Sequence, residues 1–132
     1  MRARGFTLVE VLVVCAVGVL LATIAWPSYR GQLQRAARAE AIEALQRLQL
    51  AQERHREAFG VYATELKSVG FAPATHGGRY VLALVPEGVE SYRALAVARA
   101  DGPQAGDACP ELSVEVRQGF ATLGPDGRCW NR

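Results

Sequence analysis

The chain has 132 residues, 50% of them apolar and 21% charged, and its formal net charge is +2. This length allows one compact domain with an attachment, and the near balance of charge gives no electrostatic reason to expect tight nucleic-acid binding. The sequence contains no nucleophile elbow, P-loop, dinucleotide-binding glycine motif or metal-ligand set, so it indicates no enzyme, catalytic residue, metal or cofactor.

The first element in chain order is an apolar run over residues 7–26, which follows the basic residues Arg2 and Arg4. As a helix, a run of about 20 residues spans about 30 Å, the thickness of the hydrocarbon core of a membrane. The run is too long for a secretory signal peptide and no small-residue cleavage site follows it, so we interpret it as an uncleaved membrane anchor. Cys15 lies in its middle and is expected to act as a small apolar residue.

The carboxylate of Glu10 lies near the beginning of this run, where it is costly. A charged side chain costs about 2.5–3.5 kcal/mol at the centre of a membrane and less near its surface, while the helix dipole returns only about 0.3–1 kcal/mol. Cleavage of the chain between Gly5 and Phe6 would create an amine that supplies a cation. The alternative is an anchor that tolerates an acidic residue beside the lipid headgroups.

Residues 5–10, GFTLVE, resemble the signature of type IV prepilins, because they follow a short basic leader and precede an apolar run. The resemblance implies that a prepilin peptidase removes a leader of residues 1–5 by cutting after Gly5 and then methylates the new amine of Phe6. It also implies that Glu10 pairs with the Phe6 amine of a neighbouring subunit during filament assembly. Such a pair would fix the stagger of adjacent subunits, because a wrong stagger leaves two charges unpaired in apolar surroundings.

We place the transmembrane and filament-core helix at residues 6–27 and a pilin head at residues 28–132. Residues 32–59 are predicted to form an amphipathic helix, because Ala, Leu, Gln, Glu and Arg dominate them. Pro27 lacks an amide donor and favours a bend, so we expect one long helix, bent at Pro27, that runs from the membrane into the head.

The expected head helix has an apolar stripe and a glycine at its end. Gly60 is a candidate C-terminal cap. Residues 60–78 are expected to be a connecting loop whose apolar residues pack, with subunit contacts as the favoured interpretation and a loose coil as the alternative. The apolar stripe is expected at a spacing of three, at Ile42, Leu45, Leu48 and Ala51, with Ala41, Ala44 and Leu50 near them.

Strand signals fill residues 79–123, where we expect an antiparallel sheet of three to four strands. One face of this sheet should pack on the helix stripe and the other should face water, which makes the fold class α+β. A turn is expected at residues 86–88 and another at Gln118 and Gly119. The expected strands are residues 79–85, 92–98, 112–117 and, as a short return strand, 120–123.

Cys109 and Cys129 bound a C-terminal region, residues 109–129, that a disulfide would close. If oxidised, a loop of this size would contribute about 3 kcal/mol, and it would need an oxidising compartment. The alternative is two free buried thiols, and the export indicated by the apolar run favours the disulfide. A long helix on an antiparallel sheet with a C-terminal disulfide loop resembles the type IV pilin fold, in particular that of small PilE-like minor pilins.

The leading interpretation is a structural subunit of a type IV pilus, a minor pilin that joins or primes the filament. The resemblance implies other pilin subunits, the prepilin peptidase and the assembly machinery of the inner membrane as partners, and the membrane itself through residues 7–26. We expect a single-pass protein of the bacterial inner membrane with its head in the periplasm, and a pilus at the cell surface after assembly. A major pilin and a type II secretion pseudopilin are alternatives.

A DNA-receptor pilin for natural transformation is the alternative from a different functional class. It would need a basic stripe on the head, because phosphate contacts dominate the affinity for DNA. Acidic residues interrupt such a stripe in the sequence, so nucleic acid is the less favoured partner. The basic candidates are Arg93, Arg99, Arg117 and Arg128, and the interrupting residues are Glu111, Glu115 and Asp126.

Overall fold

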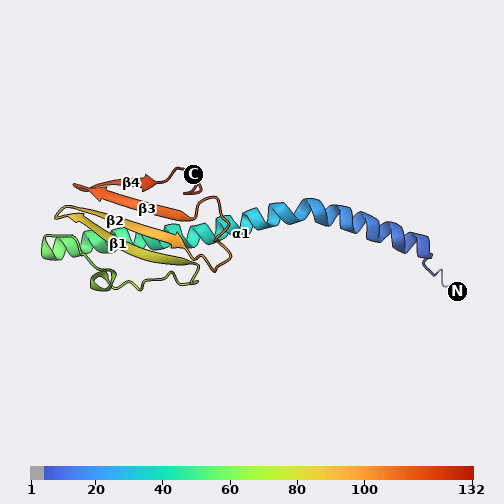
Figure 1. Cartoon of the computed structure of the whole chain (residues 1–132), viewed down its shortest axis with the longest axis horizontal. Helices are drawn as coiled ribbons and strands as arrows, with labels where there is room; N and C mark the ends of the chain where they lie inside the picture. The colour runs from blue at the N-terminus through green and yellow to red at the C-terminus, as the bar shows by residue number, and fades with distance from the viewer. Residues whose placement is uncertain (1–4) are drawn as a thin grey trace. The chain divides into compact units, whose positions relative to one another are not determined.

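The computed structural model describes residues 5–132, and these residues form one long helix, one short 3-10 helix and four strands (Figure 1). The α+β class expected from the sequence is confirmed. Residues 1–4, which hold Arg2 and Arg4 and most of the expected leader, lie outside the described residues. In chain order the elements are α1 (Leu8–Phe59), η1 (Leu66–Val69), β1 (Tyr80–Gly88), β2 (Ser91–Ala98), β3 (Glu111–Arg117) and β4 (Phe120–Gly124).

The chain divides into two compact units, Met1–Leu33 and Gln34–Arg132, and α1 contributes to both. In the first unit α1 is long and apolar enough to cross a membrane, and none of that apolar stretch is buried. Pro27 lies inside the helix, which continues through it. The single long helix expected from the sequence is therefore confirmed.

In the second unit α1 packs one face against the sheet (Figure 1). The expected stripe is buried at Ala41, Leu45 and Leu48, and Ile42 packs against the core while only half-buried, but Ala51 is also only half-buried and Leu50 is exposed. A strict spacing of three drifts by about 60° around the helix at each step, whereas mixed spacings of three and four stay on one face. The buried residues of α1 are Ala37, Ala41, Leu45, Leu48 and Gln52.

Gln52 is fully buried, and the connecting loop satisfies its amide group. Its Nε2 donates to the carbonyl of Ala63 at 3.0 Å, and its Oε1 accepts from the N–H of Ala63 at 2.8 Å. Tyr62 and Ala63 are buried beside it, so the loop packs on the head and the loose coil is wrong. The apolar residues Leu66, Val69 and Phe71 also pack against the core. Subunit contacts by this loop stay a prediction.

The four strands lie in the order β1-β2-β3-β4, and each is antiparallel to its neighbour. Alternation along β2 and β3 directs every second side chain into the core, because successive side chains of a strand point to opposite faces. The fully buried residues of these two strands are Tyr92, Ala94, Ala96, Leu112, Val114 and Val116.

Strand β1 is longer than the sequence analysis predicted, because it continues through Pro86 to Gly88. The turn expected at residues 86–88 is therefore wrong, and the hairpin turns at residues 89–90, between the paired Gly88 and Ser91. β1 is an edge strand, where a proline that lacks a backbone donor is tolerated, and the pairing register shifts between Pro86 and Gly88.

Two of the expected chain reversals need left-handed backbone geometry. Gly60 ends α1 with φ of 79°, and its N–H donates to the carbonyl of Arg56 at 2.7 Å. Gln118 and Gly119 join β3 to β4 with φ of 51° and 84°, the combination found in two-residue hairpin turns. Both reversals lie where the sequence places them.

Candidate functional sites

The residues expected at the cleavage and methylation site, Gly5 and Phe6, lie just before α1. The Phe6 side chain is 83% exposed, and a side chain added at Gly5 would meet nothing within 4 Å. Cleavage after Gly5 and methylation of Phe6 stay predictions.

Glu10 lies in the first turn of α1, and its side chain is exposed. Its backbone N–H donates to Thr7 Oγ1 at 3.3 Å, so Thr7 caps the helix. A threonine followed three residues later by a glutamate also matches the capping box, in which the glutamate bonds back to the cap residue. Among residues 5–132 the Glu10 carboxylate makes no such bond and no ion pair.

A disulfide between Cys109 and Cys129 joins the segment before β3 to the segment after β4, with the two Cα atoms 5.6 Å apart. The indole N–H of Trp130 donates to the carbonyl of Gly124 at 2.8 Å, and Asp126 Oδ1 accepts from the N–H of Cys129 at 3.1 Å. Cys109, Cys129 and Trp130 are buried. These contacts fix the last residues of the chain against the core.

Removal of this disulfide is expected to destabilise the head. A Cys109→Ser, Cys129→Ser double variant should lose about 3 kcal/mol of unfolding free energy in urea titration, because the bond restricts the unfolded chain over a separation of 20 residues. Reduction should add the mass of two hydrogen atoms to the intact chain. Cys15→Ser is the control, because Cys15 is exposed and lies outside the bond. Equal stability of the double variant and the control would contradict the expectation.

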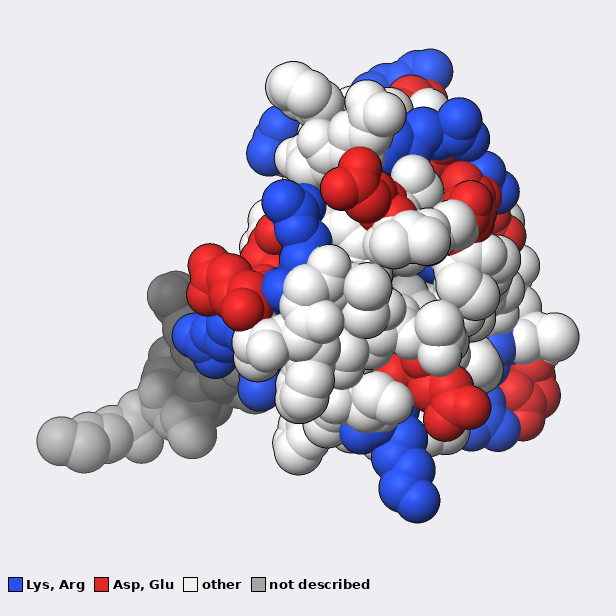
Figure 2. Space-filling model, turned by 90° about the vertical axis from the view of Figure 1, so that its left-hand side faces the viewer, with Lys and Arg blue, Asp and Glu red and all other residues white. Residues whose placement is uncertain are grey.

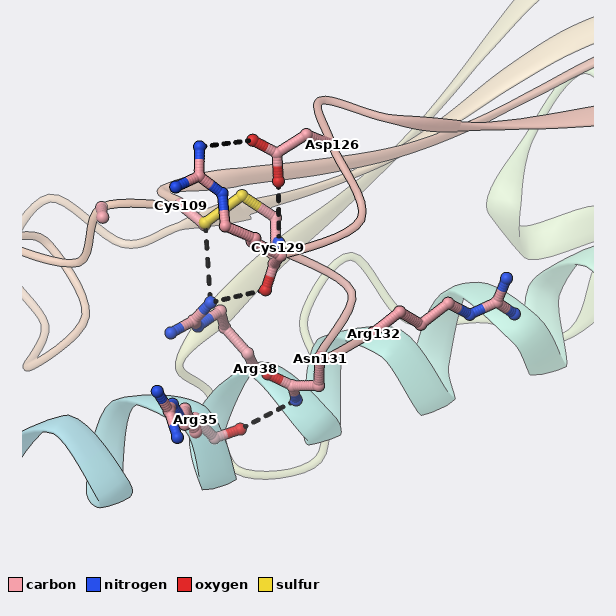
Figure 3. A pocket seen from close by; sticks show the side chains of 9 residues that line it. Arg35, Arg38, Cys109, Asp126, Cys129, Asn131 and Arg132 are labelled. Carbon is pink, nitrogen blue, oxygen red and sulfur yellow. Dashed lines mark hydrogen bonds and ion pairs between the residues drawn. A yellow bond between two sulfur atoms is a disulfide. The ribbon is translucent and has the colours of Figure 1, made fainter.

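Arg38 on α1 holds this C-terminal region in place. Its Nε lies 3.0 Å from Asp107 Oδ2, and the side chains are 12% and 2% exposed. Its Nη1 lies 3.3 Å from the carbonyl of Arg128 and 3.6 Å from Cys109 Sγ, and donates to both (Figure 3). One guanidinium thus ties α1 to the loop before β3, to the disulfide and to the segment after β4.

The loop between β2 and β3 is held by a second polar contact. Gln104 Nε2 lies 2.9 Å from the hydroxyl of Tyr80 and 3.2 Å from the carbonyl of Gln34. Burial raises the pKa of the Tyr80 hydroxyl above its usual value, so this group stays protonated while it accepts from the amide. The loop that carries Asp107 is therefore fixed to β1 and to α1.

Beside Arg38 lies an open hollow of about 620 Å³, which we call the arginine hollow. Within residues 5–132 Arg35 has no carboxylate partner. Arg128 pairs with Asp126 at 3.8 Å, and both side chains are exposed to solvent. In Figure 3 the side chain of Arg132 extends away from that of Arg35. No local pattern in the sequence marks this hollow, which is lined by Arg35, Arg38, Arg128, Arg132, Asp126, Asn131 and the disulfide.

The basic stripe considered in the sequence analysis is neutralised in the structure. Arg93 Nη2 lies 2.7 Å from Glu87 and 3.3 Å from Glu115, and Arg117 contacts the same two carboxylates. Arg99 pairs with Asp101 at 3.0 Å. On the face drawn in Figure 2, basic and acidic side chains are interspersed and form no continuous stripe.

No group of His, Cys, Asp and Glu residues suited to a metal ion occurs within residues 5–132.

Comparison with known proteins gives two family matches. Residues 27–113 match the family described as type IV minor pilin ComP, DNA uptake sequence receptor, and residues 1–26 match the prokaryotic N-terminal methylation motif. The type IV major pilin protein PilA of Myxococcus xanthus (strain DK1622) is 37% identical over 79 residues, which are 60% of this chain and 36% of PilA. The chain thus matches only about a third of the length of that relative.

Proposed function

This chain belongs to the family of type IV minor pilin ComP, and we propose that it is a structural subunit of a type IV pilus that enters the filament through the first half of α1. A prepilin peptidase cuts between Gly5 and Phe6 and methylates the new amine. The Glu10 carboxylate then pairs with the Phe6 amine of a neighbouring subunit. The apolar residues 7–26 exchange their lipid contacts for contacts with the helices of other subunits.

The observation that supports this proposal is an exposed apolar surface with one carboxylate near its start. Residues 8–26 are exposed along their whole length, and Glu10 is the only charged residue among residues 7–29. Such a surface is unfavourable in water and needs either lipid or other apolar helices around it. A pilin occupies these two environments in turn, and the single acid supplies a specific contact in the second one.

Before assembly the subunit is anchored in the inner membrane, where the assembly machinery receives it. We place the head in the periplasm, because that compartment is oxidising and permits the Cys109–Cys129 disulfide. After assembly the head becomes part of the pilus at the cell surface.

Processing of the N-terminus is the first test. In cells that contain the peptidase, intact mass and N-terminal sequencing should find a mature chain that begins at N-methylated Phe6. A Gly5→Trp variant should keep its leader, because the bulky side chain obstructs the cut bond. This variant should not disturb the fold, since a Cβ at Gly5 meets nothing within 4 Å. A wild-type chain that retains residues 1–5 beside an active peptidase would contradict the proposal.

Reception of DNA is the second candidate function, and the match over residues 27–113 to a family described as a DNA uptake sequence receptor favours it. The pairing of Arg93, Arg99 and Arg117 with carboxylates weakens the case for those side chains as phosphate contacts.

Binding of DNA can be measured on the full chain in detergent by fluorescence anisotropy with a labelled duplex. A receptor should bind at low salt, and its affinity should fall linearly with the logarithm of salt concentration as counterions are released. A duplex of shuffled sequence is the control that separates sequence recognition from binding to the backbone alone. The absence of binding at low salt would leave the subunit with its structural role only.

A further inference from the structure

The arginine hollow is not accounted for by filament assembly, which uses the first half of α1. It is not assigned by the DNA-receptor match either, because Arg128 and Arg132 lie beyond residue 113, where that match ends. We propose that the hollow binds the phosphate groups of anionic membrane lipids while the subunit is anchored in the membrane.

Of the arginines that line the hollow, Arg35 and Arg128 are available to one ligand together, because the side chain of Arg132 extends away from that of Arg35 (Figure 3). Arg38 is not one of them, because it faces the buried carboxylate of Asp107 and donates to the carbonyl of Arg128 and to Cys109 Sγ. Arg35 has no carboxylate partner within residues 5–132. The pair between Arg128 and Asp126 is long and exposed, and such pairs are worth little in water. A guanidinium presents paired N–H groups that match the oxygens of a phosphate.

Arg38 acts here as a positioning residue. By holding the backbone of Arg128 at 3.3 Å, it keeps the segment after β4 beside the first head turns of α1, where Arg35 lies. The side-chain amide of Asn131 adds a second tie, since Nδ2 donates to the carbonyl of Arg35 at 3.4 Å. The two available arginines therefore come from distant parts of the sequence to line one hollow.

The length of the chain between the membrane and the hollow favours lipid as the source of phosphate. Arg35 follows Trp26, the last residue of the expected membrane span, by nine positions. Even a fully extended chain of that length spans at most about 30 Å, so the hollow cannot lie far from the membrane surface. The membrane anchor tethers the hollow to the lipid layer, and a short tether raises the effective concentration of the headgroups to about millimolar.

The inference rests on the membrane-anchored state proposed above, and native mass spectrometry can test it. The full chain is released from nanodiscs that contain equal amounts of phosphatidylglycerol and phosphatidylcholine, whose choline cation offsets its phosphate. We expect the chain to retain phosphatidylglycerol in preference. Arg35→Gln and Arg128→Gln should each lower the ratio of retained phosphatidylglycerol to phosphatidylcholine about fivefold, as expected for one basic side chain near an anionic surface.

Two controls separate the hollow from general charge effects. Arg54→Gln removes an exposed arginine from α1 outside the hollow and should leave the lipid ratio unchanged. Arg35→Lys keeps the charge and should retain most of the preference. All four changes lie at residues with partly or fully exposed side chains, and circular dichroism checks that each variant folds.

Several results would overturn the inference. One is a lipid ratio equal to that of the bilayer, and another is an equal decrease in Arg54→Gln. A third is a loss of affinity for a DNA duplex in Arg35→Gln and Arg128→Gln while their lipid ratio stays constant. The hollow would then be a DNA site. A chain that fails to enter the nanodisc would instead refute the membrane anchorage itself.

Discussion

Replacement of Asp107 by alanine is expected to lower the free energy of unfolding by about 3 kcal/mol, because it leaves a largely buried guanidinium without its counterion. The Asp107 side chain is 2% exposed, and its Oδ2 lies 3.0 Å from Nε of Arg38, whose side chain is 12% exposed. We expect the lower end of the range for broken buried pairs, since part of Arg38 contacts water. Urea unfolding of the full chain in detergent, followed by Trp130 fluorescence in a Trp26→Phe background, measures the change.

An exposed ion pair provides the control for this prediction. Asp101→Ala removes the partner of Arg99 on the surface, where water screens the lost charge, so little change is expected. A double variant, Arg38→Met with Asp107→Leu, should recover most of the stability lost in Asp107→Ala, because no buried charge remains. If Asp107→Ala and Asp101→Ala lower the free energy of unfolding equally, the buried pair contributes no more to stability than an exposed one.

The parts of the fold that follow from local rules could be predicted from the sequence. The alternation of Leu112, Val114 and Val116 with polar residues identifies β3, because a strand with one buried face repeats every two residues. Gly60 and Gly119 mark chain reversals because few other residues adopt a positive φ. These signals lie within a few residues of the structure they specify.

Other features depend on contacts that the local sequence does not contain. Gln52 is buried on α1 because the backbone of Ala63 satisfies both ends of its amide. A polar residue is not expected on a buried helix face, so the sequence alone does not place Gln52 there. Pro86 continues β1 only because that strand lies at the edge of the sheet. Local rules place Ala51 on the buried face and a turn at Pro86, whereas the structure buries Gln52 fully and continues the strand.

The arginine hollow is the clearest example of a site without a local signal. Arg38 contacts Cys109 and Arg128 across separations of 71 and 90 residues, and no periodicity in the sequence relates these positions. The arginines on the strands were visible in the sequence, but their partners were not, since Glu87 and Glu115 reach Arg93 only through strand pairing. The N-terminal residues 5–10 are the opposite case, because their proposed role depends on a short contiguous motif.

Replacement of Glu10 by glutamine is expected to leave the amount of subunit in the membrane unchanged and to lower its incorporation into pili at least about 100-fold. A neutral glutamine avoids the cost of a charge near the lipid, so insertion should be at least as favourable as in the wild type. In the filament the Phe6 amine of the neighbour would lose its partner, and breaking a pair of this kind in apolar surroundings costs about 3–5 kcal/mol. Immunoblots of sheared pili measure the amount of incorporated subunit, and immunoblots of membrane fractions measure the amount that remains in the membrane.

Glu57→Gln is the matched control, because it makes the same chemical change on the same helix at an exposed residue of the head. It should leave incorporation unchanged. Glu10→Asp keeps the charge on a side chain one methylene shorter, so it should restore part of the lost incorporation. If Glu10→Gln subunits enter pili as efficiently as Glu57→Gln subunits, the carboxylate has no role in assembly, and apolar packing alone would have to set the stagger of the subunits.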